Sequence, residues 1–324
     1  MPAKRAFEQQ IAVLDALRTA SAEERFHGVQ KALAHRNNFL AAKGADLARE
    51  FQLAKMIPDL LTAFDRFLEN PEKTDPQCWA KNAISRALAA MEHQDPVIFL
   101  RGIRHIQLEP VWGGRSDTAG TLRATCALAL VQCRSLREPD LLGHLVELLA
   151  DKDKSVRGEA VRAIEQVGSP SAALLLRLRA VLGSDEPEVL GACYAGVLRM
   201  EGAIAISWVS RFLESADEVA AEAALAIAGT HSLEAFAALR EHFDRARDPW
   251  WRSVLLSAIA FTRQEAAQDF LFGLIRSEAL CAEAAIETIL RAAPSEETLK
   301  HLEKIVADSP RLTRALATHR GEHS

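Results

Sequence analysis

A helical hairpin of about 32 residues, repeated along the second half of the chain, most constrains what this sequence can fold into. In residues 138–170, the first segment carries leucines at the spacing of one helix face, at positions 141, 142, 145, 148 and 149. The turn "DKDKS" follows, with Asp153 as the expected N-cap. A second apolar stripe then runs through Val156, Ala160 and Ile164 until Gly168 and Pro170 end it.

The same unit returns at a nearly constant interval. The residues that occupy the position of Val156 in later copies are Val189, Val219, Trp251 and Leu280. Successive anchors are 33, 30, 32 and 29 residues apart. A step of this size is typical of equivalent hairpins that stack on one another, each burying its apolar face against the next.

The first 137 residues carry less regular copies. The segments "CWAKNAISRALAAM" (78–91) and "TLRATCALALVQC" (121–133) align with residues 154–167, which places Lys81 and Arg123 in the column of Arg157. A weaker match adds Lys43. We therefore expect an all-α fold, one continuous right-handed α-solenoid with irregular hairpins over 1–137 and regular repeats over 138–324.

One segment, Asp153-Lys154-Ser155-Val156-Arg157 with Ala160 and Ile164, resembles the second-helix signature of HEAT repeats, including the short form in phycobilin-lyase-type repeat proteins. Residues 248–252, "DPWWR", look like a second copy. The resemblance implies an armadillo-like helical solenoid whose second helices line a concave face. It also implies that the column of Lys43, Lys81, Arg123 and Arg157 lies near that face.

A surplus segment, residues 108–116, interrupts this pattern. A helix expected over 95–107 would bury Phe99, Ile103 and Ile106. The connection to the next helix then reads "LEPVWGGRS", in which Pro110 holds Glu109 extended and the two glycines allow a turn. Ser116 or Asp117 is the expected cap of the following helix.

The candidate binding residues come from the basic column and from this surplus segment. Trp and Arg are enriched in binding hot spots, which favours a working site, whereas a tryptophan that folds back would only fill a gap between unequal repeats. The cations of the column either face an anionic partner or pair with aspartates and tie repeats together. The predicted site residues are Lys43, Lys81, Arg101, Arg104, His105, Glu109, Trp112, Arg115 and Arg123.

Composition and charge narrow the class of protein. Residues 1–137 carry a charge of +4 and the remainder −9, which is too weak an asymmetry to imply nucleic acid by itself. The five cysteines are widely spaced with no CxxC, so neither a disulfide framework nor a zinc site is expected. No apolar run reaches the length of a membrane span, and no secretory signal opens the chain, so we expect a cytoplasmic protein with no membrane partner.

Motifs for catalysis are missing from the sequence. It has no HExxH, GxSxG or GxxxxGK[ST], and no His-Glu dipeptide of the kind used by HEAT-repeat hydroxylases of the deoxyhypusine type. We therefore expect a non-enzymatic scaffold, without cofactor or metal, that receives a protein or peptide of acidic character in its concave groove. The alternative is a nucleic-acid-binding protein similar to HEAT-like DNA glycosylases. A HEAT-repeat lyase or hydroxylase is the least favoured reading.

Overall fold

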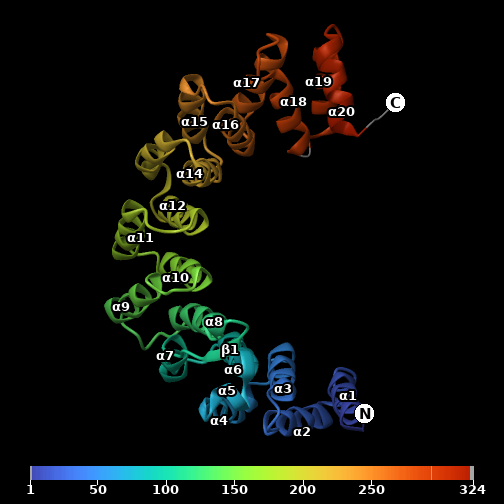
Figure 1. The fold of residues 1–324 in the computed structure, drawn as a ribbon, viewed down its shortest axis with the longest axis vertical. Coiled ribbons are helices and arrows are strands. Elements are labelled where there is room, and N and C mark those ends of the chain that lie inside the picture. Colours follow the sequence, from blue (N-terminus) through green and yellow to red (C-terminus); the bar gives the residue numbers. More distant parts are fainter. Residues whose placement is uncertain (1, 293, 322–324) are drawn as a thin grey trace. The chain divides into compact units, whose positions relative to one another are not determined.

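The computed structural model describes residues 2–292 and 294–321, which fold almost entirely into helices (Figure 1). The chain divides into two units, with the boundary after Val167. Within each unit, helices are joined in pairs by short turns, and successive pairs pack side by side. The expected all-α fold of stacked helical hairpins is therefore confirmed.

The first unit contains helices α1 to α10 and a two-stranded antiparallel hairpin. Its second helices form one packed row, in which α3 contacts α6, α6 contacts α8, and α8 contacts α10. The elements are α1 (Pro2–Ala16), α2 (Ala22–Leu33), α3 (Asn38–Glu50), the 3-10 turn η1 (Ala54–Met56), α4 (Ile57–Leu68), α5 (Pro71–Thr74), η2 (Pro76–Cys78), α6 (Trp79–Ala90), α7 (Val97–Ile103), β1 (Leu108–Val111), β2 (Gly114–Asp117), α8 (Gly120–Val131), α9 (Glu138–Leu149) and α10 (Lys154–Val167).

The second unit repeats the arrangement with shorter turns. Here α12, α14, α16, α18 and α20 pack in succession. The elements are α11 (Pro170–Leu182), α12 (Pro187–Glu201), η3 (Gly202–Ala205), α13 (Ile206–Ser210), η4 (Arg211–Ser215), α14 (Glu218–Ala228), α15 (Leu233–Arg245), α16 (Pro249–Phe261), α17 (Glu265–Arg276), α18 (Ala282–Arg291), α19 (Glu296–Val306) and α20 (Pro310–Arg320).

Local sequence explains where many of these helices begin. A serine or aspartate precedes the first turn, and its side chain accepts a hydrogen bond from the backbone N–H three residues later, which satisfies one of the unpaired donors of that turn. This cap occurs at Ser169, Asp217, Ser232, Asp248 and Ser295. Asp153 acts similarly, since its Oδ1 accepts from the N–H of Ser155.

The predicted core is correct for most positions and wrong for two. The five leucines of α9 and the stripe of Val156, Ala160 and Ile164 on α10 are buried. Leu280 is instead fully exposed, because α18 begins only at Ala282, and Ala282 is the buried residue there. Ile106 is also exposed, because α7 ends at Ile103, well before the expected helix end at residue 107.

The departure of the chain at the end of α7 has a physical cause. The N–H of Gln107 donates to the Asp117 carboxylate at 3.0 Å, and the Gln107 carbonyl accepts from the N–H of Thr118 at 2.9 Å. These bonds close residues 108–117 into an antiparallel hairpin in which Leu108 faces Asp117 and Val111 faces Gly114. Asp117 therefore holds the base of the hairpin, and α8 starts without a side-chain cap.

Candidate binding site at the 108–117 hairpin

The surplus segment is a two-stranded hairpin with Trp112 and Gly113 at its turn; we call residues 108–117 the Trp112 hairpin. Gly113 has a φ of +89°, a backbone conformation that suits glycine at the second position of a type II turn. The Trp112 side chain is 103% exposed. The alternative in which this tryptophan fills a gap between repeats is thereby excluded.

Glu109 fastens the hairpin to the loop before α6. Its Oε1 accepts hydrogen bonds from the N–H of Gln77 at 2.6 Å, from Gln107 Nε2 at 2.5 Å and from Thr118 Oγ1 at 2.9 Å. Partial burial alone would raise the pKa of Glu109, but these hydrogen bonds outweigh it, and the pKa lies below its ordinary value. The carboxylate thus stays ionised and keeps all three donors.

The loop that Glu109 reaches is strained. Gln77 and Cys78 are consecutive non-glycine residues with φ values of +61° and +54°. Such conformations cost free energy and persist only where the surroundings impose them. Here Glu109 binds the N–H of Gln77, and the Cys78 thiol donates to Gln107 Oε1 at 3.1 Å. The hairpin and the strained loop therefore hold each other in place.

Lys81 lies beneath this loop, with no exposed surface. Its Nζ is 3.0 Å from Asp75 Oδ2 and donates to the Phe67 carbonyl at 3.1 Å, and both side chains of the ion pair are 0% exposed. Asp75 also accepts from the N–H groups of Ala80 and Lys81. Lys81 thus ties α6 to the end of α4, and does not face a groove.

Arg123 makes a second buried junction. Its Nε and Nη2 bind both oxygens of Asp151 at 2.7 and 3.0 Å, while Nη1 binds Asp117 Oδ2 at 2.7 Å and the His105 carbonyl at 2.9 Å. Burial alone would lower the pKa of Arg123, but the two carboxylates outweigh the effect of burial, and the pKa of Arg123 is raised. The base of the Trp112 hairpin is thereby tied to the turn between α9 and α10.

Of the remaining predicted residues, two arginines already carry carboxylate partners. Arg115 pairs with Glu72 at 2.6 Å and also donates to the Leu108 carbonyl, and Arg101 pairs with Asp65 at 2.6 Å. Arg104 is exposed, with no ion pair among the described residues.

His105 and Lys43 lie apart from the tip of the hairpin. His105 is half-buried, and its Nε2 is 3.1 Å from Gln107 Oε1. Burial lowers the pKa of His105, which favours the neutral ring at pH 7. Lys43 is half-buried on α3, with its Nζ 6.0 Å from the centre of the Phe39 ring.

The structure therefore gathers some predicted residues and separates others. Glu109, Arg123 and His105 meet beneath the hairpin, and Trp112 and Arg115 lie on it, whereas Arg101 and Lys43 lie on other helices. The acidic and amide partners that organise the network carry no repeat signature, so the sequence pattern did not predict them. These partners are Asp75, Gln107, Asp117 in this role, and Asp151. The dipeptide Asp75-Pro76 before a helical segment was the available signal for a structural carboxylate.

The described residues offer neither a cluster of metal ligands nor a reactive thiol near the hairpin. Within residues 2–292 and 294–321, no group of three or more His, Cys, Asp or Glu side chains is placed to hold a metal ion. All five cysteines are free thiols. Burial raises the pKa of Cys78 to about 12, so this thiol is protonated and a poor nucleophile at neutral pH.

One helical stretch, Pro187–Ser215, is long and apolar enough to cross a membrane by length and composition alone. However, 56% of its most apolar window is buried inside the protein, as in the core helices of soluble proteins. The stretch is also broken into α12, η3, α13 and η4. These features are consistent with a soluble protein, and a cytoplasmic location stays a prediction.

Comparison with known proteins finds a likeness to solved structures. No family model matches the sequence, and no curated protein matches it either. A solved structure of human deoxyhypusine hydroxylase in complex with glycerol aligns with 80% of this chain and 97% of its own, at 19% sequence identity and a TM-score of 0.30. The stacked helical hairpins of this chain are established by its own helix contacts, and membership of the HEAT-repeat family is not shown.

This likeness corrects the expected function. The expectation of a non-enzymatic scaffold with a peptide in its concave groove was wrong as it stood, because a solved structure aligned with most of the chain is an enzyme. A helical repeat architecture therefore gives no ground for excluding catalysis. At this identity and TM-score the likeness assigns no activity to this chain.

Proposed function

We propose that the Trp112 hairpin is a recognition element that inserts its tryptophan into an apolar pocket on a protein partner. The observation that carries the proposal is the complete exposure of the Trp112 indole at the tip of a fastened hairpin. Tryptophan ordinarily buries most of its large apolar surface, and it is among the residues most enriched in binding hot spots. A partner pocket would remove this surface from water.

The hairpin is supported in the conformation that binding would need. A two-stranded hairpin alone is marginally stable in water. Here Glu109 and Asp117 hold its base, and Arg115 bridges Glu72 and the Leu108 carbonyl along its side. An element that is already ordered loses less conformational entropy on binding. These contacts therefore favour tight binding through a small surface.

The surroundings of Trp112 favour apolar contact over the acidic partner expected from the sequence. Val111, Leu108 and Ile106 are exposed near the indole in the chain. Arg115, the arginine on the hairpin itself, already pairs with Glu72, so it adds little attraction for an acidic surface. Pro110 in β1 has no N–H to donate, which disfavours addition of a partner strand at that edge.

The test compares partners captured by three forms of the full chain: wild type, Trp112→Ala and the matched control Trp250→Ala. Trp250 is a half-exposed tryptophan on α16, remote in sequence from the hairpin. We expect one protein to bind wild type and Trp250→Ala equally, and its dissociation constant to rise about 30-fold for Trp112→Ala, the size of a hot-spot loss. If every captured protein binds Trp112→Ala as tightly as the control, the proposal is wrong.

A further inference from the structure

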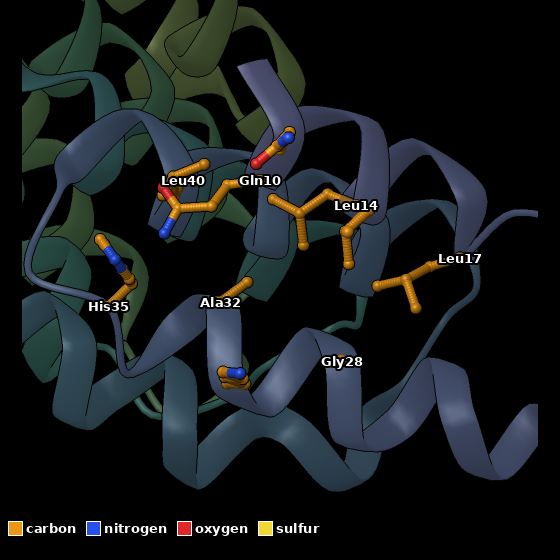
Figure 2. A pocket seen from close by; sticks show the side chains of 10 residues that line it. Gln10, Leu14, Leu17, Gly28, Ala32, His35 and Leu40 are labelled. Atoms are coloured by element: carbon orange, nitrogen blue, oxygen red, sulfur yellow. The ribbon is translucent and has the colours of Figure 1, made fainter. Parts of the chain in front are cut away.

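A groove between the first three helices forms a second, separate candidate site (Figure 2). Its volume is about 410 Å³, within the range of small-molecule sites. The residues that line it are Gln9, Gln10, Val13, Leu14, Leu17, Gly28, Lys31, Ala32, His35 and Leu40. It lies in unit 1 at α1, α2 and the start of α3, away from the Trp112 hairpin.

The groove has a polar end and an apolar end. A Cβ atom on Gly28 would lie 2.6 Å from Leu17 Cδ1, so the end of α1 meets the second turn of α2. Figure 2 shows Gln10, Leu40 and His35 gathered at one end, Leu17 and Gly28 at the other, and Leu14 and Ala32 between them. From Gly28 to Leu33, where α2 ends, the helix rises about 7.5 Å, at roughly 1.5 Å per residue.

Each polar side chain that lines the groove can donate a hydrogen bond, since the glutamine amides, Lys31 and His35 all carry N–H groups. His35 Nδ1 accepts the N–H of Asn37 at 3.0 Å, so the neutral ring carries its proton on Nε2 and can donate it. Lys31 is exposed and forms no ion pair among the described residues. No aspartate or glutamate is among the lining residues. The polar end is therefore complementary to a negative head group.

We propose that this groove binds an organic anion with an unbranched apolar tail, such as a medium-chain carboxylate. The head group lies at the polar end, where the His35 and Gln10 side chains supply donors. Lys31, a lining residue four positions before His35 in the chain, supplies positive charge to the groove. The tail lies along Leu14 toward Leu17, where its burial removes apolar surface from water. Gly28 leaves room at this end, since a side chain there would meet Leu17.

The experiment is calorimetric titration of the full chain with decanoate below its micelle concentration, and with decyltrimethylammonium, which has the same tail and the opposite charge. Wild type is compared with Lys31→Glu, with Val13→Asp on the exposed apolar wall, and with Lys55→Glu. Lys55 is an exposed lysine outside the groove, so it is a matched control for the change of charge. The thermal unfolding midpoint of each variant reports whether it is folded.

We expect decanoate to bind wild type and Lys55→Glu with one site per chain and at least tenfold more tightly than decyltrimethylammonium. Lys31→Glu and Val13→Asp should each weaken decanoate binding at least tenfold while remaining folded. Equal binding of the two amphiphiles by wild type would overturn the proposal, as would no binding of decanoate. Unchanged decanoate affinity in both folded groove variants would also overturn it, by placing the anion elsewhere.

Discussion

At the scale of single residues, the basic column has a structural role at three of its positions, because Arg157 is buried and donates to the carbonyls of Asp151 and Lys152, and Lys81 and Arg123 are buried as well. Lys81 and Arg123 occupy equivalent places near the start of α6 and α8, as the alignment predicted, but both are buried against carboxylates. Sequence alone placed the cations in register because the repeat spacing is visible in it. It could not supply the partners, because Asp75 and Asp151 come from different turns, before and after their cations.

Replacing Lys81 with Met should strongly destabilise the protein. The substitution keeps the apolar stem but leaves the Asp75 carboxylate buried without its counter-charge, which typically costs about 3–5 kcal/mol. The measurement is urea unfolding followed by circular dichroism, with Lys55→Met as the control at an exposed lysine. A Lys81→Met protein as stable as the control would show that the backbone N–H groups suffice for Asp75.

At the scale of elements, the helices followed from the sequence and the hairpin did not. Helices such as α9 bury one face, so their leucines recur with the helical period. The strands β1 and β2 bury neither face fully, so no alternation of apolar and polar residues marks them. What forms the hairpin is Glu109 and Asp117, whose partners at Gln77, Gln107 and Arg123 become visible only when the chain is folded.

The Trp112 hairpin should loosen in Glu109→Gln. The neutral amide is a weaker acceptor for the three donors that meet the carboxylate. We expect amide hydrogen exchange in residues 108–117 to accelerate about tenfold, the equivalent of one net hydrogen bond. Glu72→Gln, which removes only the exposed ion pair to Arg115, should change it much less. Equal effects of the two variants would contradict this role for Glu109.

Acid should have the same effect as that substitution. The pKa of Glu109 and that of Asp117 are both lowered in the folded protein, so their contribution to stability is present above the ordinary carboxyl pKa, roughly 4. This contribution to stability is lost when the pH falls below about 4 and passes through the lower pKa values that the two carboxyl groups have in the folded protein. Hairpin exchange should therefore remain protected at pH 5, after correction for intrinsic rates, and lose protection toward pH 3. The Glu109→Gln protein should show a smaller change.

At the scale of the whole molecule, the repeat pattern predicts the order of hairpins and not every boundary. The step from Trp251 to Leu280 was misplaced because a turn occupies residues 277–281 and α18 starts at Ala282. The continuity of one right-handed solenoid across residue 167 stays a prediction. In each unit, however, hairpins contact mainly their neighbours, which is the usual property of repeat proteins.

Because hairpins contact mainly their neighbours, a destabilising substitution should accelerate hydrogen exchange only near the substituted residue. In Lys81→Met, faster hydrogen exchange should appear in α6 and in α3, α4 and α8, which pack against it. Residues 168–321 should keep the exchange rates of wild type under native conditions. Peptide-resolved exchange with mass spectrometry measures both regions in one sample. Uniform acceleration over all described residues would show that the protein unfolds as one cooperative block.

The burial of the cysteines has a practical consequence for such measurements. Cys78, Cys126, Cys133 and Cys193 are buried, whereas Cys281 is half-exposed at the start of α18. A maleimide dye applied to the native protein therefore has one favoured attachment point, in the second unit. The wild-type chain thus carries its own position for a fluorophore or spin label. The rate at which a thiol reagent modifies the four buried cysteines would report how often the core opens.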